Sequence, residues 1–281
     1  MIDASELNDK NNQFWSEPCG TNAMLDMGIN PMNLQEVEKF DDWYFDFYPY
    51  LLEYLNKIDF KDAHVLEVGI GLGTVSRFLA QRASSLTCLD IAEGATSYVK
   101  STLKDHDNVK FICQSVLDFL PMKKFDVVIA IGSLHHTGNL ENALVKIEKM
   151  LRDNGTILVM VYYAFQPRRC LVHPLRTLKE FVQTSFQGPR NRLIFEEHDA
   201  KLRARADANQ AGEAAPYTAF SSRRLFNNRV RVEYEVELKN FHRVPILSGF
   251  LSRNFFLKYF SRFAGCDIYA FGKCNTNLQY D

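Results

Sequence analysis

The sequence has no pair of cysteines at the C-x-x-C spacing, and none of its 6 cysteines has a histidine partner at a zinc-binding spacing. Scattered cysteines of this kind indicate a reduced, cytoplasmic protein rather than a disulfide scaffold. No apolar run reaches the roughly 18 residues that a membrane-spanning helix needs. The first residues, MIDASELNDK, carry acids and amides instead of a basic and then an apolar segment. We therefore expect neither a signal peptide nor a transmembrane segment.

Internal repeats and low-complexity tracts are also absent, which argues against a solenoid or a fibrous protein. What is present is ordinary globular composition, with 46% hydrophobic and 24% charged residues in 281. A chain of this length can bury a full core as one large domain, or as a domain with a lid.

The formal net charge of −1 hides an uneven distribution of charge. Residues 1–60 contain 12 acids and 3 bases, whereas residues 165–265 contain 9 acids and 18 bases. Such a split can report a partner or substrate of opposite charge. Equally, the two segments can lie against each other or simply carry solvated charges.

Short apolar segments alternate with helical patterns through the middle of the chain, which is typical of a parallel sheet with right-handed crossovers. An alternating segment and a final strand follow, and they predict an antiparallel pair at the sheet edge. The fold class is therefore α/β, a doubly wound and mostly parallel sheet. The expected strands are 63–68, 85–89, 109–113, 125–131, 156–162, 230–238 and 266–273, and the expected helices are 34–55, 74–82, 95–104 and 140–151.

These patterns divide the chain into four parts. Residues 1–60 are expected to form a helical cover and residues 61–163 the core. Residues 164–228 are expected to form a basic lid inserted between strands five and six, with helical pieces and a flexible stretch at 206–215. Residues 229–281 are expected to add the last two strands, with a helical insertion between them.

The sharpest signal is the segment VLEVGIGLGT at 65–74, in which a strand runs into Gly69, Gly71 and Gly73 and then into a helix beginning at Thr74. Glycines allow a tight turn and a close ligand approach, and the helix N-terminus offers free N–H groups. Asp90 ends the next strand, where a carboxylate can accept both ribose hydroxyls. The pattern predicts a cofactor that contains a nucleoside.

The loop differs from a dinucleotide fingerprint, because Thr74 stands where G-x-G-x-x-G has its last glycine. Glu67, two positions before the first glycine, suits an ammonium group and would repel a phosphate. These two features favour S-adenosylmethionine over NAD.

At this point the sequence resembles a family, the class I S-adenosylmethionine-dependent methyltransferases with a seven-stranded, Rossmann-like sheet. The resemblance rests on VLEVGIGLGT, LDIA at 89–92, SVLDF at 115–119, FDVVIAIGSLHH at 125–136 and LRDNGTILV at 151–159. It implies that the glycine loop holds the methionine part and that Asp90 holds the ribose. It also implies adenine contacts from Ile91, Ser115 and Val116, and places Ile131 near the sulfonium.

Methyl transfer depends mainly on positioning, and a base is needed only when the acceptor must lose a proton. His136, with His135 beside it, is the candidate base, since both follow the fourth expected strand. The alternative is that the two histidines only stabilise the loop through hydrogen bonds. We expect no metal site there, because adjacent side chains on an extended segment point to opposite faces.

Tyr162 and Tyr163 end the fifth expected strand and can line the acceptor pocket or simply pack. Arg168 begins a set of arginines that can bind carboxylate or phosphate. That set is Arg168, Arg169, Arg190, Arg192, Arg203, Arg205, Arg223 and Arg224. The aromatic and basic stretch at 250–263 fits either a half-buried lid helix, a subunit contact, or a helix at a membrane surface.

The main hypothesis is a methyltransferase that acts on an O, N or C atom of a small, acidic metabolite. An RNA methyltransferase, an NAD-dependent oxidoreductase or nucleotide-sugar enzyme, and a noncatalytic cofactor-binding module are the alternatives. The pI near 6.7 and the lack of a nucleic-acid-binding motif argue against RNA. Whether the protein is a homodimer stays open.

Overall fold

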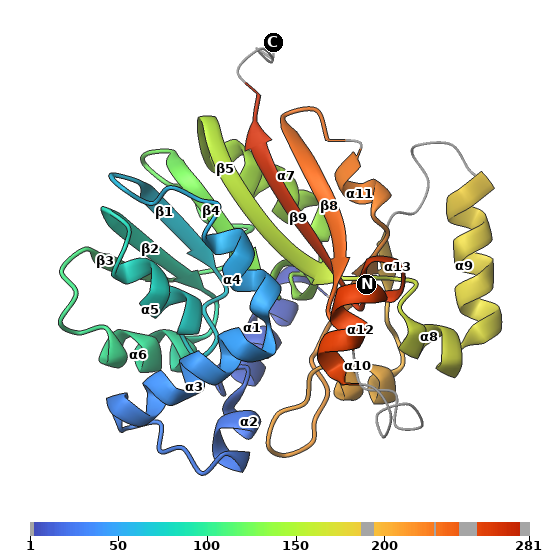
Figure 1. Ribbon diagram of the computed structural model, residues 1–281, viewed down its shortest axis with the longest axis horizontal. Coiled ribbons are helices and arrows are strands. Elements are labelled where there is room, and N and C mark those ends of the chain that lie inside the picture. Colours follow the sequence, from blue (N-terminus) through green and yellow to red (C-terminus); the bar gives the residue numbers. More distant parts are fainter. Residues whose placement is uncertain (1–2, 187–193, 228, 242–251, 276–281) are drawn as a thin grey trace.

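A seven-stranded sheet forms the centre of the protein, as seen in the computed structural model (Figure 1). The structure describes residues 3–186, 194–227, 229–241 and 252–275. The strand order is β3-β2-β1-β4-β5-β9-β8, and every pairing from β3 to β5 is parallel. β9 runs antiparallel to both of its neighbours, so the last two strands form the antiparallel pair at the edge that the sequence predicted.

The seven strands agree with the expected segments to within a few residues at each end. The central strands β1 and β4 are short, apolar and almost fully buried, whereas β8 alternates apolar residues with exposed glutamates at the sheet edge. The bounds of the seven strands are β1 His64–Val68, β2 Ser85–Asp90, β3 Val109–Cys113, β4 Phe125–Ile131, β5 Leu151–Tyr162, β8 Val232–Lys239 and β9 Asp267–Cys274.

Helices cover both faces of the sheet, which confirms the doubly wound α/β architecture. On one face, apolar side chains of α4 (Pro49–Leu55), α5 (Thr74–Ala80) and α6 (Glu93–Thr102) form one core with β1, β2 and β4. On the other face, α7 (Leu140–Met150) and α11 (Arg224–Asn227) pack against the strands and bury a second core. Figure 1 shows α4 in front of the sheet and α7 behind it.

The N-terminal cover contains more helix than the sequence predicted. The expected helix at 34–55 is two helices, α3 (Leu34–Phe47) and α4, because Pro49 begins a new helix after Tyr48 leaves the helical conformation. α1 (Ala4–Trp15) and α2 (Thr21–Asp26) were not predicted. α1 buries only Leu7, Asn11 and Phe14, a face too narrow to show in its polar composition.

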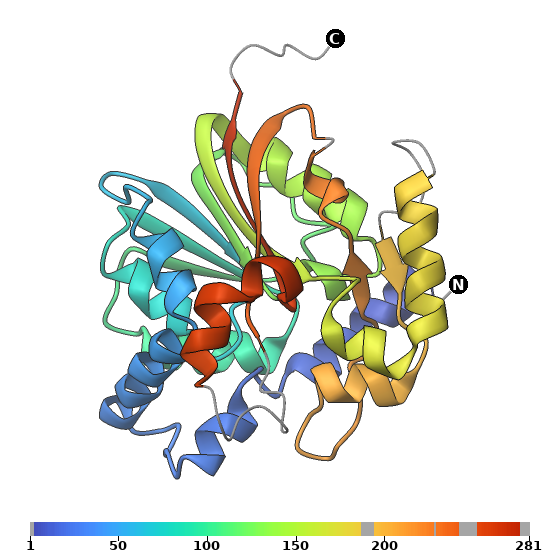
Figure 2. The same ribbon diagram turned by 45° about the vertical axis from the view of Figure 1, so that its right-hand side comes forward.

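The lid segment carries a small sheet that the sequence did not predict. β6 (Ile194–Glu196) and β7 (Ala219–Ser221) pair antiparallel beside the helices α8 (Pro167–Val172), α9 (Pro174–Phe186) and α10 (Ala200–Ala206). Near the C-terminus lie α12 (Arg253–Tyr259) and α13 (Ser261–Ala264), within the aromatic and basic stretch. Residues 250 and 251 of that stretch lie outside the described residues. Figure 2 shows the lid helices beside the core and the N-terminal helices below it.

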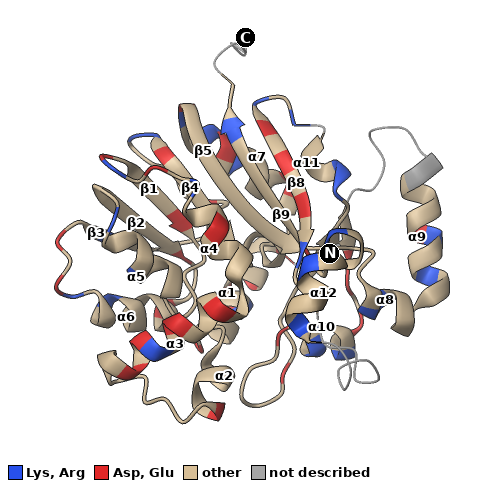
Figure 3. Ribbon diagram, viewed as in Figure 1, with Lys and Arg blue, Asp and Glu red and all other residues tan. Residues whose placement is uncertain are grey.

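Charged residues of both signs lie close together in several parts of the fold (Figure 3). Arg229 is paired with Glu148 of α7 at 2.8 Å, and Arg169 is paired with Glu180 of α9 at 3.0 Å. Many of the arginines that make residues 165–265 basic therefore have internal partners. No helix in the described ranges combines the length and apolar character that crossing a bilayer requires.

Candidate functional site

A cavity of about 390 Å³ lies where β1, β2, β4 and β5 end. Its volume is within the range of small-molecule and cofactor sites. Core residues line it together with Trp15 and Cys19 of the N-terminal segment and Asp207 of residues 164–228. Residues from all four parts of the chain therefore surround one cavity, at the edge of the sheet where open α/β folds bind their ligands.

The glycine loop connects β1 to α5 along the cavity, and Gly69, Gly71 and Gly73 all have positive φ. A Cβ on Gly69 would lie 2.2 Å from the Cβ of Ser133, so a side chain is excluded there by packing. At Gly71 the nearest atom to such a Cβ is the carbonyl oxygen of Cys19, at 3.6 Å. Gly71 therefore presents open backbone to the cavity, whereas Gly73 lies under Val99 and does not line the cavity.

Asp90 stands at the end of β2 and connects it to the glycine loop. Its carboxylate accepts hydrogen bonds from the backbone N–H groups of Ile70 and Ala92, at 2.7 and 2.8 Å. Burial raises the pKa of Asp90, and backbone hydrogen bonds, including those from Ile91 and Gly71, oppose that effect. Because Asp90 also lines the cavity, it is placed to accept hydrogen bonds from sugar hydroxyls.

Glu67 reaches the same cavity from inside β1 and is only 3% exposed. Its Oε2 accepts a hydrogen bond of 2.6 Å from the Ser76 hydroxyl. The pKa of Glu67 is raised to about 8, chiefly by burial, while the Ser76 hydrogen bond lowers it and the nearby Asp90 raises it. A cationic group arriving in the cavity would favour the ionised form.

The other residues predicted at the cofactor also line the cavity. Ile91, Ser115 and Val116 follow β2 and β3, and Ile131 ends β4. Thr74 contributes to the lining and donates a hydrogen bond from its hydroxyl to Asp41 at 2.6 Å. Apolar side chains and a hydroxyl at this end suit the face and edge of a purine ring.

His136 lies at the opposite end of the cavity, in a short 3-10 helix at Leu134–His136. Its Nδ1 lies 2.7 Å from the carbonyl oxygen of Tyr217, which can only accept, so Nδ1 carries a proton. Nε2 then faces Asp207, with Oδ2 at 3.6 Å. Burial lowers the pKa of His136, and Asp207 opposes that effect in part. The backbone carbonyl of His136 is held by the amide of Asn11 at 2.9 Å.

His135 does not line the cavity, so it cannot be the base through direct contact with an acceptor bound there. Its ring is fully buried, and burial lowers its pKa well below the usual value. The ring lies 4.0 Å from that of Tyr162 and 4.2 Å from that of His136, measured between centroids.

Of the two tyrosines at the end of β5, only Tyr162 lines the cavity. Its hydroxyl donates to the carboxylate of Asp207 at 3.0 Å. Tyr163 packs with the core on the other face and against Phe165, because successive side chains of a strand point to opposite faces. Tyr163 is therefore not part of this cavity.

Arg168 lines the cavity and donates to the backbone carbonyl of Arg205 at 2.7 Å. Arg169 also borders the cavity, but its guanidinium is 2% exposed and is paired with Glu180 and, at 3.4 Å, with Glu197. Arg203 donates to two backbone carbonyls. Arg190 and Arg192 lie outside the described residues. Of the predicted arginine set, Arg168, Arg169 and Arg205 line the cavity.

Sequence reasoning missed two buried carboxylates that the fold brings to the cavity. Asp207 comes from the lid, and burial raises its pKa. Asp267 begins β9, where it is paired in register with Tyr162, and burial raises its pKa to about 7. No local pattern marks either residue, because each meets the site only through contacts between segments far apart in the sequence.

The stretch at 206–215, expected to be flexible, is a hydrogen-bonded turn. Ala208 and Ala214 form a bridge, and the Asn209 side chain accepts from the backbone N–H of Glu213 at 2.9 Å. The N–H of Ala215 donates to the carbonyl of Asp207 at 3.1 Å. These bonds hold Asp207 at the base of the turn, beside His136.

Comparison with known proteins relates the central part of the chain to methyltransferases. The family described as methyltransferase domain matches residues 66–159, which run from β1 to the middle of β5. The match includes the glycine loop, Asp90 and both histidines.

The ribosomal RNA small subunit methyltransferase A of Streptococcus thermophilus is 42% identical over 57 residues, which are 20% of each chain. The ubiquinone biosynthesis O-methyltransferase of Coxiella burnetii is 24% identical over 147 residues, covering 52% of this chain and 55% of the relative. The chain thus spans a fifth to about half of the length of these relatives.

Among solved structures, a putative S-adenosylmethionine-dependent methyltransferase from Listeria monocytogenes shares the fold. Its TM-score is 0.54 at 14% identity, over 82% of this chain and 96% of that one. Residues 66–159 therefore match the methyltransferase domain family, and the chain shares its fold with that solved structure.

Proposed function

We propose that the whole chain is an enzyme that transfers a methyl group from S-adenosylmethionine to a small acceptor. The observation that carries this proposal is the pair of carboxylates, Glu67 and Asp90, on either side of the glycine loop in one cavity. Asp90 suits the ribose hydroxyls and Glu67 the ammonium group of the methionine part.

The residues present fit this cofactor better than a dinucleotide. Besides Glu67 and Asp90, the cavity is lined by the carboxyl groups of Asp207 and of the buried Asp267. These four acidic groups outnumber the three arginines that line the cavity, Arg168, Arg169 and Arg205, and they favour a ligand with cationic centres, such as an ammonium and a sulfonium, over a pyrophosphate. This argues against the NAD-dependent alternative.

The acceptor would lie at the other end of the cavity, near His136 and Tyr162. S-adenosylmethionine supplies the methyl group when bound, and the protein aligns the acceptor atom behind the methyl carbon and excludes water. In a proton-dependent transfer, Nε2 of His136 is the atom that accepts the acceptor's proton, because Nδ1 is occupied by the Tyr217 carbonyl. His135 would act only through its packing against His136.

The cofactor is tested by titrating the purified protein with S-adenosylhomocysteine in a calorimeter, with NADH as a parallel ligand. We expect micromolar binding of S-adenosylhomocysteine alone, followed by transfer of labelled methyl to a small acceptor. Binding of NADH alone would overturn the proposal. Cofactor binding with no transfer to any acceptor, even in cell extract, would instead indicate a noncatalytic binding module.

The acceptor is further proposed to be a small acidic metabolite. An acidic metabolite is supported by Arg168, which lines the cavity, and the named relatives suggest an oxygen acceptor or an RNA. The internal pairing of the arginines argues against a broad RNA surface. Weak RNA binding with little salt dependence would agree, whereas a steep salt dependence would favour RNA.

For an acidic acceptor, Arg168→Ala should raise the KM about tenfold, as expected when a hydrogen bond to a charged group is lost. The affinity for S-adenosylhomocysteine should change little, because the hydrogen bond of Arg168 is made to the Arg205 carbonyl and not to the glycine loop or Asp90. Arg223→Ala, an exposed arginine of the same segment that does not line the cavity, is the matched control. An unchanged KM for Arg168→Ala would remove the argument for an anionic acceptor.

A further inference from the structure

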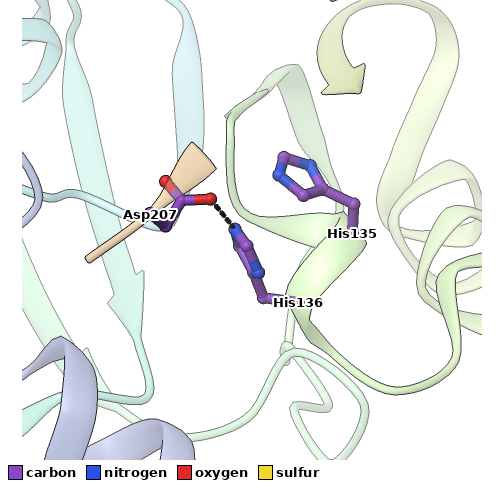
Figure 4. Close-up of side chains that lie close together, drawn as sticks. All are labelled: His135, His136 and Asp207. Atoms are coloured by element: carbon purple, nitrogen blue, oxygen red, sulfur yellow. Dashed lines mark ion pairs between the residues drawn. The ribbon is translucent and has the colours of Figure 1, made fainter. Parts of the chain in front are cut away.

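His135 and His136 are not on an extended segment, which was the reason to expect no metal site. They lie in the 3-10 helix at Leu134–His136, where adjacent side chains can share one side. Their ring centroids are 4.2 Å apart. Figure 4 shows both rings next to the Asp207 carboxylate, which comes from the lid.

One ring nitrogen of His135, one of His136 and one carboxylate oxygen of Asp207 all lie within 4.8 Å of one another. Three such atoms share a point no more than about 2.8 Å from each, which is 4.8 Å divided by √3. Bonds to zinc are about 2.0–2.2 Å long for these ligand types. Each side chain would therefore need to move by less than about 1 Å to coordinate an ion at that point.

Three of the four histidine ring nitrogens in this cluster make no hydrogen bond within the described part of the chain. Neither ring nitrogen of His135, nor Nε2 of His136, has a hydrogen-bond partner there. Yet His135 is fully buried and His136 is 5% exposed. A buried polar atom without a partner is costly, and an ion is one of the few groups that satisfies several such atoms at once.

Two of the three side chains are also held as metal ligands usually are. Nδ1 of His136 donates to the carbonyl of Tyr217, which leaves the Nε2 lone pair directed at the cluster. The Tyr162 hydroxyl donates to both carboxylate oxygens of Asp207 at 3.0 Å. Outer hydrogen bonds of this kind orient ligands in metal sites.

We propose that His135, His136 and Asp207 bind one divalent transition-metal ion. Two imidazoles and one carboxylate suit zinc, iron or cobalt better than magnesium or calcium, which prefer all-oxygen sites. With three protein ligands the ion would keep an open position. That position would be on the side of the cavity, because His136 and Asp207 both line it.

The use of the ion rests on the proposed function. A hydroxyl of the acceptor bound at the open position would lose its proton to water more readily. Its oxygen would then form a bond to the methyl carbon, while the electron pair of the broken carbon–sulfur bond stays on sulfur. No electron carrier is needed. In the metal-free protein, Nε2 of His136 would be the proton acceptor instead.

The test is binding of cobalt and zinc to the full chain after removal of metals with a chelator. We expect one equivalent of Co²⁺ to give visible absorption of a low-symmetry site, and Zn²⁺ to displace it. His135→Gln and Asp207→Asn should each weaken binding by at least about tenfold. Tyr162→Phe should weaken it less, and His198→Ala, an exposed histidine outside the cluster, should leave it unchanged.

Far-ultraviolet circular dichroism of every variant without metal shows that each is folded. Metal binding that is unchanged in His135→Gln and in Asp207→Asn would overturn the proposal, and so would a wild-type protein that binds neither ion. In that case S-adenosylhomocysteine binding and methyl transfer in the presence of chelator would still support the proposed function. The two proposals can therefore fail separately.

Discussion

Replacing Asp90 by alanine should weaken the binding of S-adenosylhomocysteine by about tenfold to a hundredfold. A hydrogen bond to a charged group contributes about 1.5–3 kcal/mol, and each 1.4 kcal/mol is a factor of ten. Asp90 lines the cavity at the end of β2, where its carboxylate can accept hydrogen bonds from ribose hydroxyls. Calorimetric titration of the variant at neutral pH gives the change directly.

Asp90 also accepts hydrogen bonds from the backbone of Ile70 and Ala92, so the variant can lose affinity through a loosened glycine loop. A second ligand separates the two effects. If Asp90 binds the ribose, the wild type should prefer S-adenosylhomocysteine to its 2′-deoxy analogue, and Asp90→Ala should lose most of that preference. Asp105 is an exposed acid between α6 and β3, and Asp105→Ala should change neither affinity.

An Asp90→Ala protein that keeps wild-type affinity would contradict the proposed cofactor site. If Asp90→Ala binds both ligands more weakly by the same factor, Asp90 acts only by holding the backbone of the glycine loop. Either result would leave the fold as described, because the sheet does not depend on a ligand.

Most of the sheet could be predicted because its signals are local. Each strand is a short apolar segment that ends at a glycine or a polar turn, as β1 ends at Gly69, and period and length suffice to identify it. The failures occurred where tertiary contacts override local pattern. β6 and β7 have only three residues each and exist through their pairing with each other. α1 is stabilised by a narrow buried face rather than by a strong apolar stripe.

The cofactor end of the cavity was predictable for the same reason. Gly69, Gly71, Asp90 and Glu67 all stand at the ends of neighbouring strands, and the ends of parallel strands meet at one edge of a sheet. His136 and Tyr162 follow β4 and end β5, so they could be predicted in the same way, but the rest of the acceptor end could not.

Two acids at that end come from segments far from the rest of the site. Asp207 stands 71 positions beyond His136 in the sequence and reaches it through the lid. Asp267 reaches Tyr162 through the antiparallel pairing of β5 and β9. Spacing along the chain carries no information about contacts of this kind.

Replacing Glu67 by glutamine should have two opposite effects, more stability at high pH and weaker cofactor binding. The pKa of Glu67 is raised from 4.5 to about 8 in the folded protein, chiefly by burial. A carboxyl group with a raised pKa contributes stability below about pH 4.5 that is lost as the pH rises towards 8. Glutamine can still accept the Ser76 hydrogen bond but has no charge to bury.

The free energy of unfolding of Glu67→Gln, relative to that of the wild type, should therefore increase by about 3 kcal/mol between pH 5 and pH 8. Urea unfolding of both proteins without cofactor at the two pH values measures this difference. Contributions from Asp207 and Asp267 cancel, because both proteins contain these residues. Glu38 is exposed, and its side chain has no hydrogen bond or ion pair with the described residues. Glu38→Gln should therefore show no such increase. A pH-independent difference would mean that Glu67 is ionised in the folded protein.

Cofactor binding should move in the other direction. At pH 7 most Glu67 is protonated, so an ammonium group that binds beside it must displace the proton. Binding of S-adenosylhomocysteine to the wild type should therefore release a proton, seen as a binding enthalpy that depends on the ionisation enthalpy of the buffer. Glu67→Gln should bind about tenfold more weakly and lose that part of the buffer dependence.

The combination distinguishes a ligand-binding role from a structural one. A glutamate kept only for its contact with Ser76 would give the stability gain at high pH without any change in affinity or proton release. A buried acid destabilises the free protein at neutral pH, and a bound cation removes that destabilisation. Such an acid is expected where binding requires a charge. Weaker binding together with greater stability in one variant would therefore assign Glu67 to the methionine end of the cofactor.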